Sequence, residues 1–362
     1  MIYNSLVKTL LFQLDAERAH DLTYQFAQKV SDSSFLQAVA RAIYNYQSPK
    51  LSQNIWGLTF KNPIGLAAGF DKNGKIPRAM EATGFGFVEV GSITGDPSIG
   101  NPRPRMFRLP KDRAVINRMG LNNDGAKTVV KRLKNKKISI PLGINIAKTH
   151  DSSVMGDRAI QDYIHSFHEA KKIADYITIN ISCPNTEEGK TFEDPKALNE
   201  LLSGLNIRGD ARMLPTLVKI SSDLSKAELM KLLQVCEEHR VHGYVACNTS
   251  SKRDNLMTNS SVLDKIGTGG LSGPPIAEKS IQIIQWISKA TNGQKPIIGV
   301  GGIDSFSTAL KMMLAGADLL QVYTGLIYEG PSLIKDINRQ LVKELKELNV
   351  DTIHQLVTAA EL

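Results

Sequence analysis

The sequence of 362 residues is poor in cysteine and has no long apolar run. Its three cysteines, Cys183, Cys236 and Cys247, are too few and too irregularly spaced for a disulfide framework or a zinc site, so we expect a reducing compartment. No stretch of about 18 uncharged apolar residues predicts a membrane-spanning helix. The first residues also lack the basic, apolar and small-residue segments of a signal peptide, so none is expected.

Charge of one sign is not concentrated either. Lysine and arginine together number 44 against 36 acidic residues, a formal net charge of +8. The basic residues are scattered apart from a run at 131–137, which is typical of a solvated helix end. This density excludes a dedicated nucleic-acid binder, whereas a basic surface facing an anionic substrate or a membrane stays open. No histidine cluster or carboxylate pair predicts a metal site.

From residue 62 onward, short apolar runs alternate with amphipathic segments of helical length. Buried parallel strands are typical of such runs, and eight strand–helix repeats predict an α/β fold of the (β/α)8 TIM-barrel type, with a doubly wound sheet as the alternative. Segment 51–60 is expected to form a hairpin at the barrel floor. The eight predicted strands cover 64–68, 87–91, 141–146, 176–181, 217–220, 244–248, 297–300 and 319–323.

Residues 1–46 predict a small helical appendage to a barrel domain of residues 47–362. Three apolar stripes at helical spacing fall at 6–14, 22–30 and 36–43, and the break at 47–49 separates them from the barrel. Helices packed against the barrel would produce these stripes. Helices lying in the interface of a membrane would do so too. The pattern alone favours packing against the barrel.

Polar residues follow or end nearly every predicted strand. Asn145, Asn180 and Lys219 are examples, and a lone Asn after a strand is usually only a turn residue. A whole set of them predicts an active site, because barrel enzymes carry their chemistry at the carboxyl ends of the strands. A snorkelling surface lysine is the alternative for Lys219, which its place inside an apolar run disfavours.

Glycine clusters follow the last three predicted strands, at 269–273, 299–302 and Gly325. Tight turns need glycine too, but glycines after strands seven and eight are typical of the phosphate site of this barrel. Buried lysines and amides without metal ligands imply that a cofactor supplies the reactivity. A phosphate-anchored flavin fits, with Lys219 stabilising negative charge on the reduced ring.

Three motifs, together with the glycine segments, resemble the dihydroorotate dehydrogenase family over essentially the whole chain. They are NPIGLAAGFDK at 62–72, NRMGLNN at 117–123 and NISCPNT at 180–186. Residues 12–20, FQLDAERAH, resemble the signature of the class 2 branch, which is quinone-dependent and membrane-associated, whereas class 1 members lack such an extension.

The resemblance implies oxidation of (S)-dihydroorotate to orotate in de novo pyrimidine (UMP) synthesis. A base takes a proton from C5 while a hydride leaves C6 for FMN, and a membrane quinone then reoxidises the flavin. It further implies a monomer attached peripherally to the cytoplasmic face of the cell membrane. We expect the barrel to carry the first half-reaction by itself and the N-terminal helices to serve the quinone step.

The family motifs also imply the residues of the site. The residues expected to bind FMN are Ala68, Gly69, Phe70, Asp71, Lys72, Ser92, Asn145, Asn180, Lys219, Cys247, Gly273, Gly302, Tyr323 and Thr324. The residues expected to bind substrate are Lys72, Asn117, Arg118, Met119, Gly120, Leu121, Asn180, Asn185, Asn248 and Thr249. A cation and amides suit a small anionic ring that carries carbonyl and N–H edges.

The catalytic base is expected to be Cys183. Class 2 members carry serine at this position and class 1 members carry cysteine, so this residue departs from the class that the N-terminus indicates. A thiol is more acidic than a hydroxyl and can act as a base directly near neutral pH. A buried structural thiol is the alternative.

Other functions compete with this hypothesis. Within enzymes, the alternative is a class 1 dihydroorotate dehydrogenase linked to fumarate, or another FMN barrel that acts on a pyrimidine-like ring with a different acceptor. A sugar-phosphate isomerase barrel would require a carboxylate base at a strand end, which the sequence does not show. A catalytically inactive membrane-binding module would not require the polar set.

Overall fold

The computed structural model describes residue 3 and residues 7–182, 192–209 and 214–359, and its centre is a closed barrel. All eight predicted strands form it, each hydrogen-bonded in parallel to its neighbours. The TIM-barrel prediction is therefore confirmed, and the doubly wound sheet is wrong. In order around the barrel, the strands are β3 (Ile64–Leu66), β4 (Phe87–Ile93), β7 (Leu142–Ile146), β8 (Tyr176–Asn180), β9 (Thr216–Ile220), β10 (Gly243–Ala246), β12 (Ile297–Val300) and β13 (Leu319–Val322).

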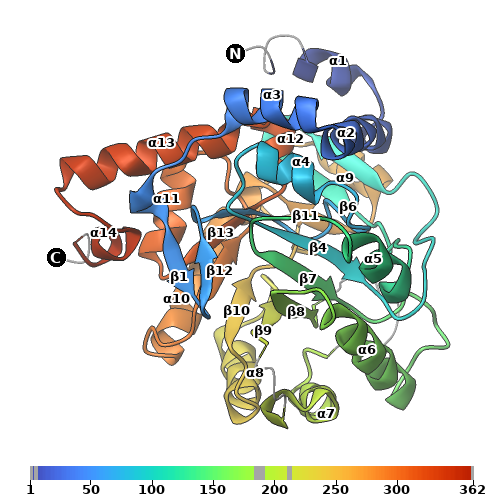
Figure 1. Cartoon of the computed structure of the whole chain (residues 1–362). Helices are drawn as coiled ribbons and strands as arrows, with labels where there is room; N and C mark the ends of the chain where they lie inside the picture. The colour runs from blue at the N-terminus through green and yellow to red at the C-terminus, as the bar shows by residue number, and fades with distance from the viewer. Residues whose placement is uncertain (1–2, 4–6, 183–191, 210–213, 360–362) are drawn as a thin grey trace.

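Helices surround the barrel and cover the outer faces of its strands (Figure 1). Helix α8 begins at Lys226, because Ser225 and Glu228 form a capping box and fix the first turn there. The helices that follow the barrel strands are α4 (Pro77–Ala82), α5 (Ala126–Leu133), α6 (Asp157–Ala170), α7 (Pro195–Leu205), α8 (Lys226–Glu238), α10 (Ala277–Ala290), α11 (Phe306–Leu314), α12 (Thr324–Glu329), α13 (Ser332–Glu347) and α14 (Ile353–Ala359).

The barrel floor is closed by a hairpin, as the sequence predicts. Strands β1 (Gln53–Ile55) and β2 (Leu58–Phe60) pair antiparallel through a turn in which Trp56 and Gly57 both have positive φ. Phe60 is fully buried, and its ring lies edge-on to Phe87 of β4 at 5.3 Å. This aromatic plug seals the amino ends of the strands, so a ligand has access only from the opposite end.

A second, three-stranded sheet that the sequence analysis did not predict lies at that opposite end. In it, β6 (Ala114–Asn117) pairs antiparallel with both β5 (Met106–Leu109) and β11 (Gly270–Ser272). The helix α9 (Ser260–Ile266) precedes β11. No local pattern indicates the pairing of β11 with β6, because β11 follows β6 by more than 150 residues and the strands are very short. The sheet places the 117–121 segment and Gly273 beside the barrel mouth.

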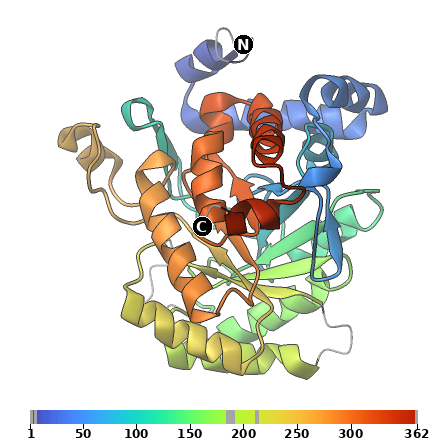
Figure 2. The ribbon, with the colours of Figure 1, turned by 90° about the vertical axis from the view of Figure 1, so that its left-hand side faces the viewer.

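Three helices at the N-terminus follow the predicted stripes: α1 (Lys8–Gln13), α2 (Ala16–Asp32) and α3 (Ser34–Tyr44). Helices α2 and α3 pack against α4, α1 contacts α2, and the backbone N–H of Ala79 donates to Ser31 at 3.0 Å. In both views these helices lie at the end of the molecule away from α7 and α8 (Figures 1 and 2).

Several apolar side chains of these helices still face outward; they are Leu10, Leu22, Phe26, Phe35, Val39 and Ile43. Packing against the barrel and contact with a membrane surface are therefore both compatible with the arrangement, and the domain boundary at residue 46 stays a prediction. Within the part of the chain that the structure describes, no helix combines the length and apolar character needed to cross a bilayer.

Candidate active site

A cavity opens at the carboxyl ends of the barrel strands, beneath the three-stranded sheet. About 1120 Å³ of space lies between its protein atoms, a figure that includes open solvent at the mouth. Most residues predicted from the sequence line it: Ala68, Gly69, Lys72, Ser92, Asn117, Met119, Gly120, Leu121, Asn180, Lys219, Cys247, Asn248, Thr249, Gly273, Gly302, Tyr323 and Thr324.

Six predicted residues are not among those lining the cavity. Cys183 and Asn185 lie outside the described residues, so the catalytic base stays a prediction from the sequence. Phe70, Asp71, Asn145 and Arg118 are described, and each is engaged elsewhere. Arg118 donates to the carbonyls of Ile266 and Thr268 and stacks on the ring of Phe107. Its guanidinium therefore fixes the segment before β11 instead of facing the cavity.

The other three stand directly behind the lining residues. Asp71 accepts from the backbone N–H groups of Lys75 and Ile76 and from the hydroxyl of Tyr24 at 2.7 Å, so it shapes the loop that presents Lys72. Asn145 is fully buried and accepts from the Ser92 hydroxyl at 2.5 Å. Their side chains act on the cavity through a neighbour.

Phe70 separates the cavity from a second pocket. Its ring lies 5.3 Å from the ring of Tyr323, which lines the cavity, and 5.3 Å from that of His20 on α2. The second pocket is almost wholly apolar and lies between the N-terminal helices and the barrel, lined by residues such as Phe12, Ala19, Phe26 and Met80. The Phe70 side chain thus lies between the two pockets, and Met106 lines both of them.

The second pocket carries few polar groups. Burial, and then the charge of Lys72, lower the pKa of His20 to about 3, so its imidazole is neutral at physiological pH. Arg108 also lines the pocket and donates to the Leu11 carbonyl at 2.9 Å. A long apolar molecule that carries one or two polar atoms matches this lining.

A buried carboxylate lies at the base of the main cavity, inside the barrel. Glu89 of β4 is fully buried and accepts from the side-chain amide of Asn145 at 2.8 Å, and from that of Gln321 at 2.7 Å. The hydroxyls of Tyr176 and Thr178 donate to the same oxygen as Gln321, and Asn145 donates to the other. Burial and the neighbouring carboxylate raise the pKa of Tyr176 well above its usual value. The sequence analysis missed Glu89, although a charged residue within a continuous apolar run was a visible signal.

Glu89 fixes the orientation of the two amides. Because Asn145 and Gln321 both direct their NH2 groups at the carboxylate, their oxygens point away from it. The Asn145 oxygen receives the Ser92 hydroxyl. The Gln321 oxygen is buried without a hydrogen-bond partner in the described part of the chain, and Gln321 lines the cavity. It therefore offers an acceptor to an N–H group of a ligand.

From Ser92 a chain of hydrogen bonds runs along the cavity wall. Asn180 donates to the Ser92 hydroxyl at 3.1 Å, and Asn248 donates to the Asn180 oxygen at 3.3 Å and to the Ser182 hydroxyl at 3.0 Å. These amides come from β8 and from the loop after β10, so closure of the barrel brings them together. Their alternating donors and acceptors suit a planar ring with carbonyl and N–H edges.

Two lysines give the cavity its positive charge, Lys72 half-buried and Lys219 buried. Lys72 donates to the Gly69 carbonyl at 2.7 Å, and burial, followed by the charge of Arg105, lowers its pKa to about 8. Lys219 projects from β9 and is only 6% exposed. Burial also raises the pKa of the Cys247 thiol to about 12, so this cysteine stays neutral. The cavity therefore favours anionic ligands.

The residues present fit a phosphate-bearing flavin. Glycines at 273 and 302 have positive φ, and a Cβ added to Gly302 would lie 2.5 Å from that of Ala277, so the backbone of both stays bare toward the cavity. Lys219 and the unpartnered Gln321 oxygen provide complementary groups for the ring. Among the described residues, no group of three or more His, Cys, Asp or Glu side chains could hold a metal ion.

Comparison with known proteins gives one consistent result. The sequence model of the dihydroorotate dehydrogenase family matches residues 50–345. A protein of Christiangramia forsetii named dihydroorotate dehydrogenase (quinone) is 38% identical, over 95% of this chain and 99% of its own. One of Natronomonas pharaonis with the same name is 42% identical, over 94% of each chain. The structure of Eimeria tenella DHODH in complex with ferulenol superimposes with a TM-score of 0.81 at 33% identity, covering 95% of each chain.

Replacing Glu89 tests whether its carboxylate organises the cavity base. Glu89→Gln places a competing NH2 group where four donors converge, so we expect a loss of about 1–3 kcal/mol in the free energy of unfolding. Glu347→Gln, at an exposed end of α13, is the matched control and should change it by less than about 0.5 kcal/mol. Denaturant unfolding of both variants measures the difference, and equal stabilities would contradict the role of Glu89.

Proposed function

This chain belongs to the dihydroorotate dehydrogenase family, and we propose on that premise that it oxidises (S)-dihydroorotate to orotate with FMN and a membrane quinone. It is an oxidoreductase, and its step belongs to de novo pyrimidine synthesis. The observation that carries the proposal is the pairing of two cavities. A cationic, amide-lined cavity at the barrel mouth is joined through Phe70 to an apolar pocket beneath the N-terminal helices.

The outer part of the cavity binds the substrate. The ammonium of Lys72 supplies a cation for the carboxylate of dihydroorotate, and Asn117, Asn180 and Asn248 supply amides for the ring. The backbone of 119–121 and the Thr249 hydroxyl complete the wall. These groups hold a small anionic ring against the inner part of the cavity, and they exclude water from one of its faces.

The inner part of the cavity would bind FMN. The backbone at 68–69, 273 and 302 and the Thr324 hydroxyl would hold the phosphate and ribityl chain, and Lys219 with Gln321 would face the ring. Ser92 and Tyr323 complete this wall. When bound, FMN supplies the hydride acceptor that no side chain of the protein can provide.

We assign to Cys183 the role of the base that removes the proton from C5 of the substrate. The assignment rests on the sequence alone: the residue occupies the base position of the NISCPNT motif. Ser182, its described neighbour, donates to the Lys219 carbonyl and accepts from Asn248, so it is committed to the cavity wall. A thiolate is a competent base near neutral pH without a further helper.

The apolar pocket is proposed as the quinone site. Its lining matches a lipid-soluble oxidant, and the exposed apolar side chains on α2 and α3 give a surface for peripheral attachment to a membrane. The cysteine at the base position favours a second candidate, a dihydroorotate dehydrogenase with a soluble acceptor such as fumarate. The N-terminal helices and the pocket that they enclose weigh against it.

The colour of the purified protein tests the function. It should be yellow, and adding dihydroorotate without oxygen should bleach the flavin absorbance. A ubiquinone or menaquinone analogue should then restore the absorbance, whereas fumarate should not. Bleaching followed by recovery with fumarate alone would select the second candidate. A protein that binds FMN and is not bleached would contradict both.

Lys219→Ala should weaken FMN retention and slow its reduction. Loss of one charge-assisted contact costs about 1.5–3 kcal/mol, which corresponds to roughly 10–150-fold weaker binding. Lys231→Ala, at an exposed position of α8, is the control and should retain the flavin of the unaltered protein. Flavin released on dilution measures both. Equal retention in the two variants would remove Lys219 from the site.

Cys183→Ala should bind orotate nearly normally and reduce FMN very slowly, because general-base catalysis contributes about 10²–10⁴-fold. Cys183→Ser should keep partial activity with an altered pH dependence, since an alcohol does not ionise near neutrality without help. Rapid-mixing measurements of flavin bleaching compare the three proteins. A rate in the alanine variant within a few-fold of the original would instead indicate a structural thiol.

A further inference from the structure

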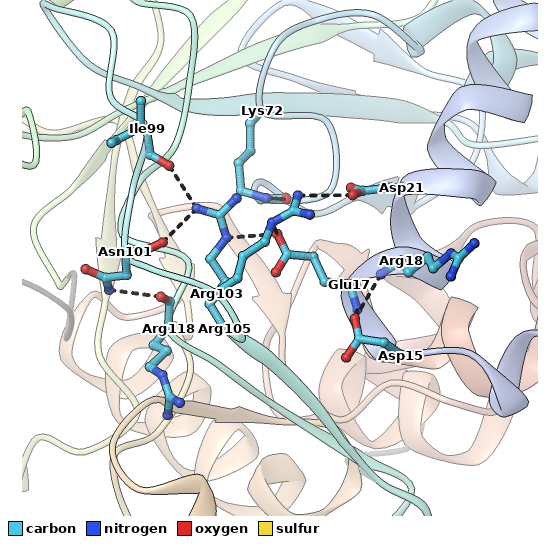
Figure 3. Close-up of polar contacts among 11 residues, drawn as sticks. Asp15, Glu17, Arg18, Asp21, Lys72, Ile99, Asn101, Arg103, Arg105 and Arg118 are labelled. Atoms are coloured by element: carbon cyan, nitrogen blue, oxygen red, sulfur yellow. Dashed lines mark hydrogen bonds and ion pairs between the residues drawn. The ribbon is translucent and has the colours of Figure 1, made fainter.

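A buried ion pair connects the N-terminal helices to the barrel mouth (Figure 3). Glu17, in the first turn of α2, accepts from the Arg105 guanidinium at 2.8 Å, and both side chains are less than a tenth exposed. Arg103 approaches the same carboxylate oxygen at 3.0 Å from the solvent side, and is itself paired with Asp21. The second oxygen of Glu17 is buried with no hydrogen-bond partner in the described ranges.

Arg105 uses its other donors on the backbone beside the proposed substrate segment. One terminal nitrogen donates to the Ile99 carbonyl at 2.8 Å and to the Asn101 carbonyl at 3.1 Å. The carbonyl of Arg105 accepts from the backbone N–H of Arg118 at 2.8 Å. The guanidinium of Arg105 therefore holds the 99–101 turn, and the backbone carbonyl of the same residue holds the opposite strand at Arg118.

The 99–101 turn also fixes the 117–121 segment. The side-chain amide of Asn101 donates to the Arg118 carbonyl at 2.9 Å, and its backbone N–H donates to the Met119 carbonyl at 3.2 Å. Gly120 approaches so closely that a Cβ there would lie 2.5 Å from the Asn101 nitrogen. The path from Glu17 to the cavity wall thus consists of consecutive hydrogen bonds through Arg105 and Asn101.

From these contacts we propose that Glu17 is a positioning residue for the substrate segment 117–121, so that the N-terminal helices take part in binding dihydroorotate and not only in the quinone step. The inference rests on the proposed function. It differs from the expectation from the sequence, in which the barrel carries the first half-reaction by itself.

The energetics support a strong dependence on Glu17. Removing one partner of a buried ion pair leaves the other charge buried and uncompensated, which is far more damaging than losing an exposed pair. Without the Glu17 carboxylate, Arg105 keeps a buried charge beside the like charge of Arg103, which favours turning its guanidinium toward solvent. That movement releases the Ile99 and Asn101 carbonyls, and with them the segment that they support.

The pair also acts electrostatically on Lys72. The charged and titratable groups around this lysine are Arg105, Glu17, Asp21, Asp71 and His20. Loss of the Glu17 charge lowers the pKa of Lys72 further below about 8, and loss of the Arg105 charge raises it. An anionic ligand prefers protonated Lys72, so orotate affinity falls as the pH rises through the pKa of this lysine. Relative to the unaltered protein, this fall should begin at a lower pH without the Glu17 charge and at a higher pH without the Arg105 charge.

Titration with orotate tests the proposal on the full-length, flavin-loaded protein, followed by the change in flavin absorbance. We expect Glu17→Gln and Arg105→Gln each to weaken orotate binding on the order of tenfold at neutral pH. The double variant should lose about as much as either single one, because the two residues act as a unit. Asp32→Asn, the same change from carboxylate to amide at the exposed end of α2, is the control and should stay within about twofold.

The pH dependence of orotate affinity distinguishes positioning from a general loss of stability, because destabilisation alone does not move the two profiles in opposite directions. If Glu17→Gln does not fold, Glu17→Asp, which keeps the charge and shortens the reach by one methylene, takes its place and should weaken orotate binding without moving the pH profile. Variants that melt at lower temperature yet bind orotate as the unaltered protein does would overturn the proposal. An unaltered protein whose flavin does not respond to orotate would instead overturn the proposed function.

Discussion

Closure of eight parallel strands around an aromatic floor is the constraint on which the rest of this molecule depends. Because Phe60 and its neighbours seal the amino ends, the carboxyl ends form the one accessible rim of the barrel, and the polar residues that end the strands converge there. Asn180 and Lys219, which lie far apart in the sequence, become lining residues of one cavity. The chemistry of the site follows from this convergence.

Buried charge is the cost of that arrangement, and each charged group is compensated in its own way. Glu89 is surrounded by four hydrogen-bond donors and no described cation touches it, so neutral dipoles stabilise it. Glu17 and Arg105 compensate one another. The charge of Lys72 is compensated only in part: its ammonium donates to the Gly69 carbonyl, and burial still lowers its pKa. An anionic substrate would complete the compensation, which is a physical reason for affinity.

The two pockets are separate in chemistry and adjacent in space. Phe70 belongs to the loop after β3, touches Tyr323 on one side and His20 on the other, and thereby joins the barrel mouth to the N-terminal helices. The Glu17–Arg105 pair joins the same two regions through polar contacts. The helices are thus connected to the barrel by an aromatic contact and an ionic contact, both close to the cavity.

The sequence by itself determined the eight strands, the floor hairpin, the three N-terminal helices and most of the cavity lining, because each depends on a local period or a motif that needs no distant partner. Only the tertiary structure decided the roles of Glu89, Asn145 and Arg118, since a side chain's partners depend on where the chain returns. The pairing of β11 with β6 and the Glu17–Arg105 pair are of the same kind. Their partners lie between 88 and more than 150 residues away, and no periodicity within a segment records a contact over such a separation.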